Sequence, residues 1–148
     1  AVPDGFLVVG SSRDELQAVS PEDARVWYLE FATDKESSLE FWAKAVRTHL
    51  VENVGYRLLD ESPVAGPQPG HQMLFEVDSE EGPMRYLLTV SREPDRAWAR
   101  NGTVQVVEFA APAQLFGEYV DAVGIASPFT IAVSNDHSGQ TSILVSER

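Results

Sequence analysis

Residues 72–90, with the sequence QMLFEVDSEEGPMRYLLTV, contain the two clearest alternating patterns in the chain. Apolar residues occupy every second position on both sides of the polar segment 78–83, so they share one face of each extended segment. These residues are Met73, Phe75 and Val77 in the first segment, and Met84, Tyr86, Leu88 and Val90 in the second. The pattern predicts an antiparallel β-hairpin with an apolar face that needs a cover.

A helical pattern earlier in the chain supplies that cover. Ser37 followed by Glu40 matches a capping box, and Gly55 supplies a stop, so we predict a helix over 38–53. Its apolar stripe consists of Leu39, Trp42, Val46 and Leu50. We expect this stripe to pack on the sheet face that carries Met73, Phe75, Tyr86 and Leu88.

Further strands are predicted on both sides of these elements. They cover residues 6–9, 16–19, 25–31, 56–61 and 103–109, with a Pro-rich loop at 62–70 and a hairpin turn at Asn101-Gly102. Pro112 opens a second helix, whose apolar face includes Leu115, Tyr119, Ala122 and Val123. Trp27 and Trp42 are assigned to the core. Consecutive strands joined by short turns pair antiparallel, so the fold class is α+β, a single antiparallel β-sheet with helices packed on it.

Length and charge limit the organisation and the partners. The chain has 148 residues, which fits one domain over 1–148, with a core at 1–126 and a C-terminal hairpin or tail at 127–148. The formal net charge is −12. Nucleic-acid binding needs clustered Lys and Arg, so this balance argues against it.

The start of the chain bears on location. The sequence contains no cysteine and begins at Ala1 rather than Met, and it lacks an apolar run long enough to span a membrane. A removed export signal and a cleaved tag both explain this start, and a lipid-carrying cysteine ahead of Ala1 remains an alternative. We expect an extracytoplasmic protein of the periplasm or cell envelope.

The sequence offers no motif for catalysis or metal binding. His49, His71 and His137 lie far apart, and Asp78 to Gly82 lacks the order of a calcium loop. No nucleophile elbow or phosphate-binding glycine loop occurs. We therefore expect a protein that is not an enzyme and uses no metal and no cofactor.

The best local candidate for a binding site is Trp98 with its flanking arginines. Arg96 and Arg100 stand out because arginine is scarce in so acidic a chain. An aromatic residue between arginines on an exposed hairpin has the composition of an interface hot spot. The alternative is that Trp98 covers the end of the sheet. We predict that Trp98, Arg96 and Arg100 bind another protein.

The order of elements resembles the PsbP-like fold family, which includes the PsbP subunit and DcrB-type envelope lipoproteins. The residues that carry the resemblance are Pro-Asp-Gly-Phe at 3–6, Leu-Glu-Phe-Trp-Ala at 39–43, and the apolar strand and Ala-Pro helix at 104–116. It covers residues 3–126, whereas the residues after 127 depart from the pattern. The resemblance implies a non-enzymatic accessory module of a larger complex.

Two other functions stay open. A small-molecule or lipid carrier needs an apolar cavity of about 300 Å³ or more between sheet and helix. A hydrolase needs two carboxylates that converge in a cleft with separated pKa values.

Overall fold

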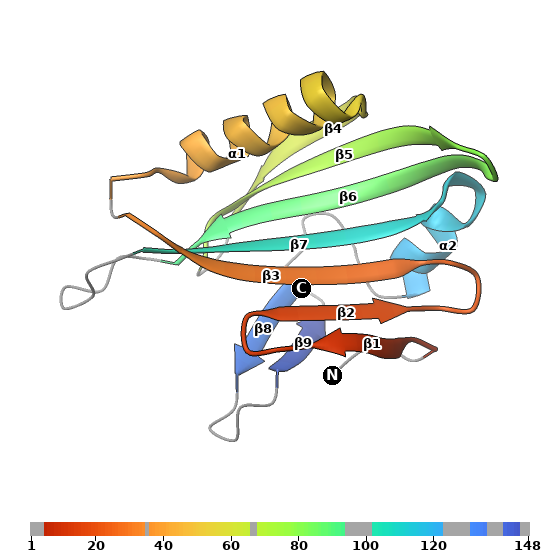
Figure 1. Ribbon diagram of the computed structural model, residues 1–148, viewed down its shortest axis with the longest axis horizontal. Coiled ribbons are helices and arrows are strands. Elements are labelled where there is room, and N and C mark those ends of the chain that lie inside the picture. Colours follow the sequence, from red (N-terminus) through yellow and green to blue (C-terminus); the bar gives the residue numbers. More distant parts are fainter. Residues whose placement is uncertain are drawn as a thin grey trace.

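The computed structural model describes residues 5–34, 36–65, 68–93, 102–122, 131–135 and 141–145, and a seven-stranded sheet forms its centre (Figure 1). The strands are β1 (Leu7–Ser11), β2 (Glu15–Val19), β3 (Arg25–Thr33), β4 (Arg57–Val64), β5 (Gly70–Ser79), β6 (Gly82–Arg92) and β7 (Gly102–Pro112). Their spatial order is β1-β2-β3-β7-β6-β5-β4, and every neighbouring pair is antiparallel. β1 and β4 are therefore the two edges.

Two helices join this sheet and confirm the predicted α+β class. α1 (Leu39–Thr48) carries the chain from β3 to the far edge strand β4, and it ends in a π-helical turn over His49–Val54. α2 (Ala113–Ala122) follows β7 and contacts β6 and β7. β8 (Ile131–Asn135) and β9 (Thr141–Val145) form a separate two-stranded ladder and do not extend the seven-stranded sheet.

The start of α1 lies one residue later than the predicted capping box. Ser38, not Ser37, is the N-cap, and its Oγ accepts a hydrogen bond from Phe41 N at 3.1 Å. Ser37 instead donates its hydroxyl to Asp34 Oδ1, which also accepts from the backbone N–H groups of Glu36 and Ser37. Asp34 thus organises the turn that precedes the helix, while Ser38 caps it.

The predicted packing of α1 on the hairpin is confirmed. Met73, Phe75, Leu88, Val90 and Val104 form a buried cluster on one face of the sheet. The helix stripe of Leu39, Trp42, Val46 and Leu50 packs against this cluster, together with Tyr86 and Phe31. The Trp42 ring meets the Phe31 ring edge-on, with centroids 5.1 Å apart. This side of the sheet is called the α1 face below.

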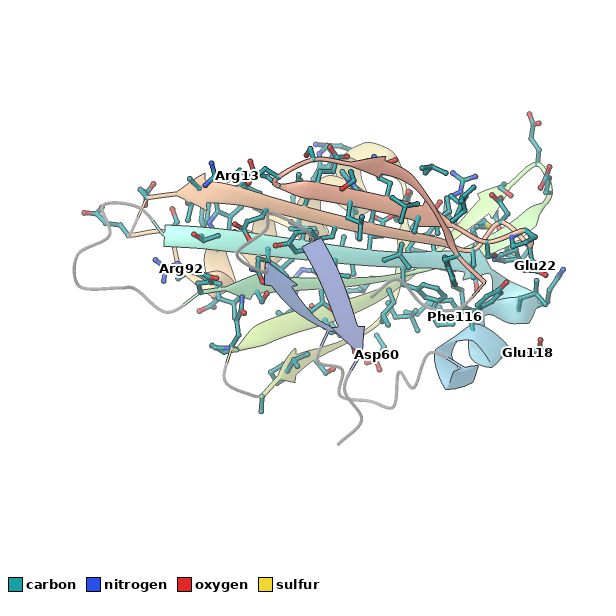
Figure 2. The ribbon with its side chains drawn as sticks, turned by 90° about the horizontal axis from the view of Figure 1, so that it is seen from below. Arg13, Glu22, Asp60, Arg92, Phe116 and Glu118 are labelled. Carbon is teal, nitrogen blue, oxygen red and sulfur yellow. The ribbon has the colours of Figure 1, made fainter. Side chains whose placement is uncertain are left out.

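α2 covers part of the opposite face, where a second cluster includes Tyr28, Phe109 and Phe116. Phe116 is buried on the side of α2 that meets the sheet (Figure 2), and its ring centroid lies 5.6 Å from that of Phe109. The sequence pattern named Tyr119 for this face but missed Phe116. Tyr119 Oη lies 2.9 Å from Ser20 Oγ, which ties α2 to the turn between β2 and β3.

Two turn predictions differ from the structure. The segment 62–70 was predicted as a loop, yet β4 continues to Val64 and β5 begins at Gly70. Pro63 is tolerated there because β4 is an edge strand, where a missing N–H need not break a ladder. Gly102 is the first residue of β7, where it pairs with Thr33, so it lies in a strand rather than in a turn.

The assignment of Trp27 to the core is wrong. Trp27 shares a face of β3 with Leu29 and Phe31, as predicted, but it remains 37% exposed. α1 packs over β5 and β6 and reaches Phe31 near the end of β3. Trp27 lies four residues away from Phe31 along β3, beyond the reach of the helix.

Candidate functional site

The α1 face carries two surface hollows, one on each side of the packed cluster. The first, called the helix groove here, runs between α1 and the strands β4 and β5 and encloses about 310 Å³. It is lined by Leu39, Glu40, Ala43, Lys44, Arg47, Pro63, Gly70 and His71. Its lining therefore mixes apolar residues with charged side chains of both signs from the helix.

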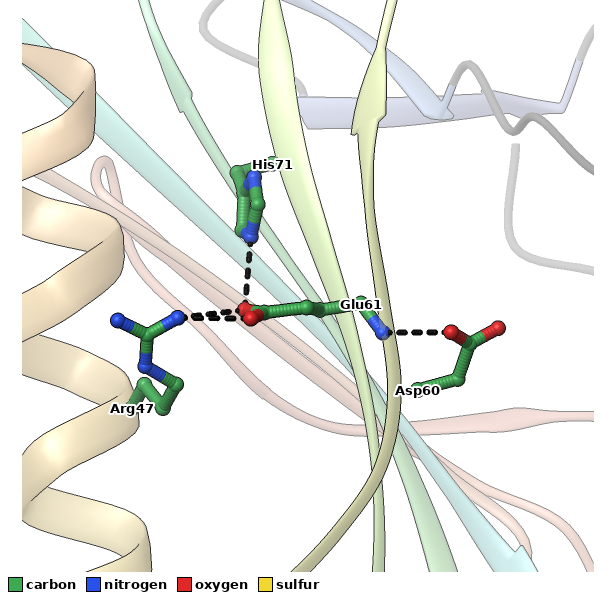
Figure 3. A network of polar contacts seen from close by, with 4 residues as sticks. All are labelled: Arg47, Asp60, Glu61 and His71. Atoms are coloured by element: carbon green, nitrogen blue, oxygen red, sulfur yellow. Dashed lines mark hydrogen bonds and ion pairs between the residues drawn. The ribbon is translucent and has the colours of Figure 1, made fainter.

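A polar network closes one wall of the helix groove (Figure 3). Arg47 Nη1 on α1 donates to both carboxylate oxygens of Glu61 on β4, each at 2.8 Å. His71 Nε2 on β5 lies 3.1 Å from Glu61 Oε2. These hydrogen bonds from His71 and Arg47 hold the pKa of Glu61 below its usual range. Asp60 points to the other side of β4 and accepts from the Glu61 backbone N–H at 2.9 Å.

The second hollow, called the Trp27 hollow here, lies on the half of the α1 face that the helix leaves uncovered. It encloses about 280 Å³. Its lining comes from β2, β3 and β7 and consists of Gln17, Ala18, Val19, Arg25, Val26, Trp27 and Glu108. Both described helices make their main contacts with other strands, so neither of them covers this half-face.

The Trp27 ring is held in one orientation. Its Nε1–H donates to Glu15 Oε1 at 2.9 Å, and Gln17 Nε2 donates to the same oxygen at 2.6 Å. The two hydrogen bonds, first from Gln17 and then from Trp27, lower the pKa of Glu15 and keep it an acceptor at neutral pH. An aromatic side chain fixed in this way loses little conformational entropy when a partner covers it.

Glu108 is the unusual residue of the Trp27 hollow. Its cross-strand partners are Trp27 on β3 and Leu88 on β6. On this face of β7 the neighbouring positions are the apolar residues Val104 and Val106. Burial raises the pKa of its carboxyl above the ordinary value of 4.5. Within the part of the chain that the structure describes, this carboxyl accepts no hydrogen bond and forms no ion pair.

The predicted binding residues lie outside the described part of the chain. Arg96, Trp98 and Arg100 fall within 94–101, so their role stays a prediction. The sequence analysis missed Trp27 as a surface residue and passed over Glu108. The signal for Glu108 was present, because an acid stands at a core-facing position of the alternating segment 103–109.

Two carboxyls lie beside Trp27, and the pKa of Glu15 is lowered whereas that of Glu108 is raised. Shifts in opposite directions are one mark of a catalytic acid–base pair. Only Glu108 lines the hollow, whereas Glu15 is engaged by Gln17 and Trp27 outside it. The helix groove likewise presents Glu61 with its carboxylate tied to Arg47 and His71. Over the described ranges, no three His, Cys, Asp or Glu residues gather as metal ligands.

Comparison with known proteins shows the fold of this chain. No family model matches the sequence, and no curated protein matches it. Among solved structures, the fold is similar to that of LpqN of Mycobacterium tuberculosis, which is described as involved in cell envelope biogenesis. The TM-score is 0.62 at 14% sequence identity, over 84% of this chain and 76% of LpqN. An α+β fold of this kind thus occurs in a cell envelope protein. None of the helices in the described part of the chain is long and apolar enough to cross a membrane.

Proposed function

We propose that this chain is a non-catalytic accessory module that binds another protein, and that the Trp27 hollow is part of the contact surface. The observation that carries the proposal is the half-exposed Trp27 ring, hydrogen-bonded to Glu15 on a part of the sheet that neither described helix covers. Tryptophan, tyrosine and arginine are the residues most enriched among interface hot spots. Arg25 lines the same hollow, so two of these residue types meet there.

The location in the cell envelope is part of the same proposal. Its support is the similarity to LpqN, a protein involved in cell envelope biogenesis. Fold similarity alone does not transfer a function, so the argument for binding rests on the Trp27 hollow itself. The PsbP-like relationship, the extracytoplasmic location and the lipid anchor ahead of Ala1 are predictions from the sequence.

Site-directed cross-linking in the native host tests protein binding at this surface. A photoreactive residue in place of Gln17 lies in the exposed lining of the hollow, and one in place of Leu59 on edge strand β4 serves as the control. We expect discrete cross-linked protein species from position 17 that disappear when Trp27→Ala is added. No adduct at position 17, or equal adducts at both positions, contradicts the proposal.

A small-molecule carrier is the second candidate, favoured by the helix groove. Its volume of about 310 Å³ lies at the lower end of the range for ligand pockets, roughly 300–1,000 Å³. Lys44 lines it and, among the described residues, forms no ion pair. Native mass spectrometry of the protein from its host tests this function. A compound of constant mass, lost in Lys44→Glu, supports a carrier, and protein of the unliganded mass contradicts it.

A further inference from the structure

We propose that the Trp27 hollow receives a basic side chain, Lys or Arg, of the partner protein, with Glu108 supplying the opposite charge and Trp27 an aromatic wall. This inference rests on the proposed function, because it names the chemistry of the partner at that same surface. It starts from a charge that the described chain leaves uncompensated.

Glu108 is that charge. Its carboxyl lines the hollow, and within the described residues no donor reaches it. A carboxyl that is partly removed from water and left without a donor has a destabilised ionised form, and a cation placed beside it relieves this cost. Tyr56 and Tyr86 lie on the far side of Glu108, with ring centroids 4.9 Å apart. They bring no positive charge.

Among the described residues that line the hollow, the cation is Arg25, and its guanidinium contacts another carboxylate. Arg25 lines the hollow, but its Nε and Nη2 both donate to Asp23 Oδ1, at 3.1 and 2.8 Å. Asp23 is fixed by its own turn, where it adopts a positive φ of 65°. In this structure Arg25 therefore contacts Asp23 and not Glu108, which leaves the Glu108 carboxyl without a cation among the described residues.

Trp27 supplies the second element of a cation site. Tryptophan is the aromatic residue that binds cations best over its ring face, at up to about 6 Å from the centroid. The hydrogen bond to Glu15 orients the ring, and Glu108 is the direct cross-strand partner of Trp27 on β7. A cation that enters the hollow therefore meets a ring and a carboxylate side by side.

The charge of the chain bears on the occupant of the hollow. About 280 Å³ lies at the lower limit of pockets for whole small ligands, roughly 300–1,000 Å³, and has room for one long side chain. The net charge of −12 steers a basic partner surface toward this chain. We therefore commit to a basic side chain presented by a protein.

Titration with n-butylguanidinium, an analogue of the arginine side chain, tests the site directly. The probe signal is the Trp27 indole N–H resonance, assigned through Trp27→Phe. We expect a saturable shift of this resonance in the wild-type chain, and an affinity at least about tenfold lower in Glu108→Gln. n-Butylurea, which has the same shape without the charge, is the control and should cause no saturable shift. Equal binding of the two compounds, equal binding to Glu108→Gln, or no binding by the wild-type chain overturns the inference.

Cross-linking separates this inference from the proposed function. With the photoreactive residue at position 17, Glu108→Gln should greatly reduce the protein adducts, whereas Glu118→Gln on the exposed side of α2 should not. Adducts that persist unchanged in Glu108→Gln overturn the role of Glu108 and leave protein binding intact. Binding of n-butylguanidinium without any protein adduct identifies a free organic cation as the occupant and overturns the commitment to a protein side chain.

Discussion

Trp27 on β3 and Glu108 on β7 lie directly opposite each other in the sheet register, on the face that α1 only partly covers. Side chains opposite each other on neighbouring strands have Cβ atoms about 4.5–5.5 Å apart. The pair therefore places a half-exposed indole next to a partly buried carboxyl, and this relationship underlies both the proposed interface and its preference for a cation.

The buried carboxyl makes stability depend on pH in a defined direction. Burial raises the pKa of Glu108 in the folded chain above its unfolded value of about 4.5. Between the two values the folded state binds more protons, so the free energy of unfolding falls as pH rises. Relative to Glu108→Gln, the wild-type chain should therefore lose stability on going from pH 4 to neutral pH. Urea unfolding at several pH values measures the difference, with Glu118→Gln as the control.

If the free energy of unfolding changed with pH in the same way in wild type and Glu108→Gln, this carboxyl would be well solvated and the prediction would be wrong. The groups that face Glu108 are Trp27, Arg25, Tyr56 and Tyr86. Burial is the main cause that raises the pKa of Tyr56, which moves its titration away from this pH range. The signal therefore belongs to Glu108.

Trp42 should contribute strongly to stability through its ring and little through its indole N–H. Its ring meets Phe31 and Phe41 edge-on, while its buried Nε1 has no hydrogen-bond partner among the described residues. Trp42→Ala should cost about 3–5 kcal/mol in the free energy of unfolding. Trp42→Phe should cost less than about half of that, because it removes an unsatisfied polar atom. Equal losses in the two variants would mean that Nε1 has a partner.

The extent of α1 explains which parts of this arrangement the sequence predicted. Alternation placed Phe31 and Trp27 on one face correctly, because side-chain direction in a strand is a local property. Whether a helix covers a given side chain is not a local property. Phe31 and Trp27 are four residues apart on β3, which is about 13 Å along the strand, whereas a helix is only about 10–12 Å across. One helix therefore covers Phe31 and leaves Trp27 exposed, which the alternation alone did not reveal.

Two other features that the sequence did not predict have similar causes. Ser37 and Ser38 are adjacent and chemically equal, so only the turn built by Asp34 decides which of them caps α1. The groove network joins Arg47, Glu61 and His71 from three separate elements, and no spacing in the sequence indicates that they meet. The fold class and the main packing thus followed from local patterns, whereas the candidate site depends on tertiary contacts.

Two glycines should respond oppositely to alanine. Gly117 lies on the exposed side of α2, where a Cβ meets no atom within 4 Å, so Gly117→Ala should stabilise the chain by about 0.4–1 kcal/mol. Gly70 is buried, and a Cβ there lies 3.1 Å from the backbone oxygen of Val90. Gly70→Ala should destabilise by about 1–3 kcal/mol. Thermal and urea unfolding of both variants test the contrast, and a stable Gly70→Ala would show that β5 and β6 can separate at this point.

The groove network should stabilise the chain modestly and lose its effect in acid. The folded-state pKa of Glu61 is depressed, so its contribution is complete above its unfolded pKa and is lost as pH falls through the folded pKa. Because Arg47 and Glu61 are each about one-third exposed, Glu61→Gln should cost no more than about 1 kcal/mol at pH 7. The cost should vanish in strong acid. Glu80→Gln in the exposed β5–β6 turn is the control, and a cost of Glu61→Gln that does not change with pH contradicts the assignment.

The affinity of the cross-linked partner, once purified, for Trp27→Ala tests the central claim most directly. Phe41→Ala, on an even more exposed aromatic of α1, controls for loss of apolar surface, and Trp98→Ala tests the hairpin predicted from the sequence. We predict that Trp27→Ala weakens binding by at least about 2 kcal/mol, while Phe41→Ala leaves it unchanged. Undiminished affinity of a folded Trp27→Ala variant would contradict the account.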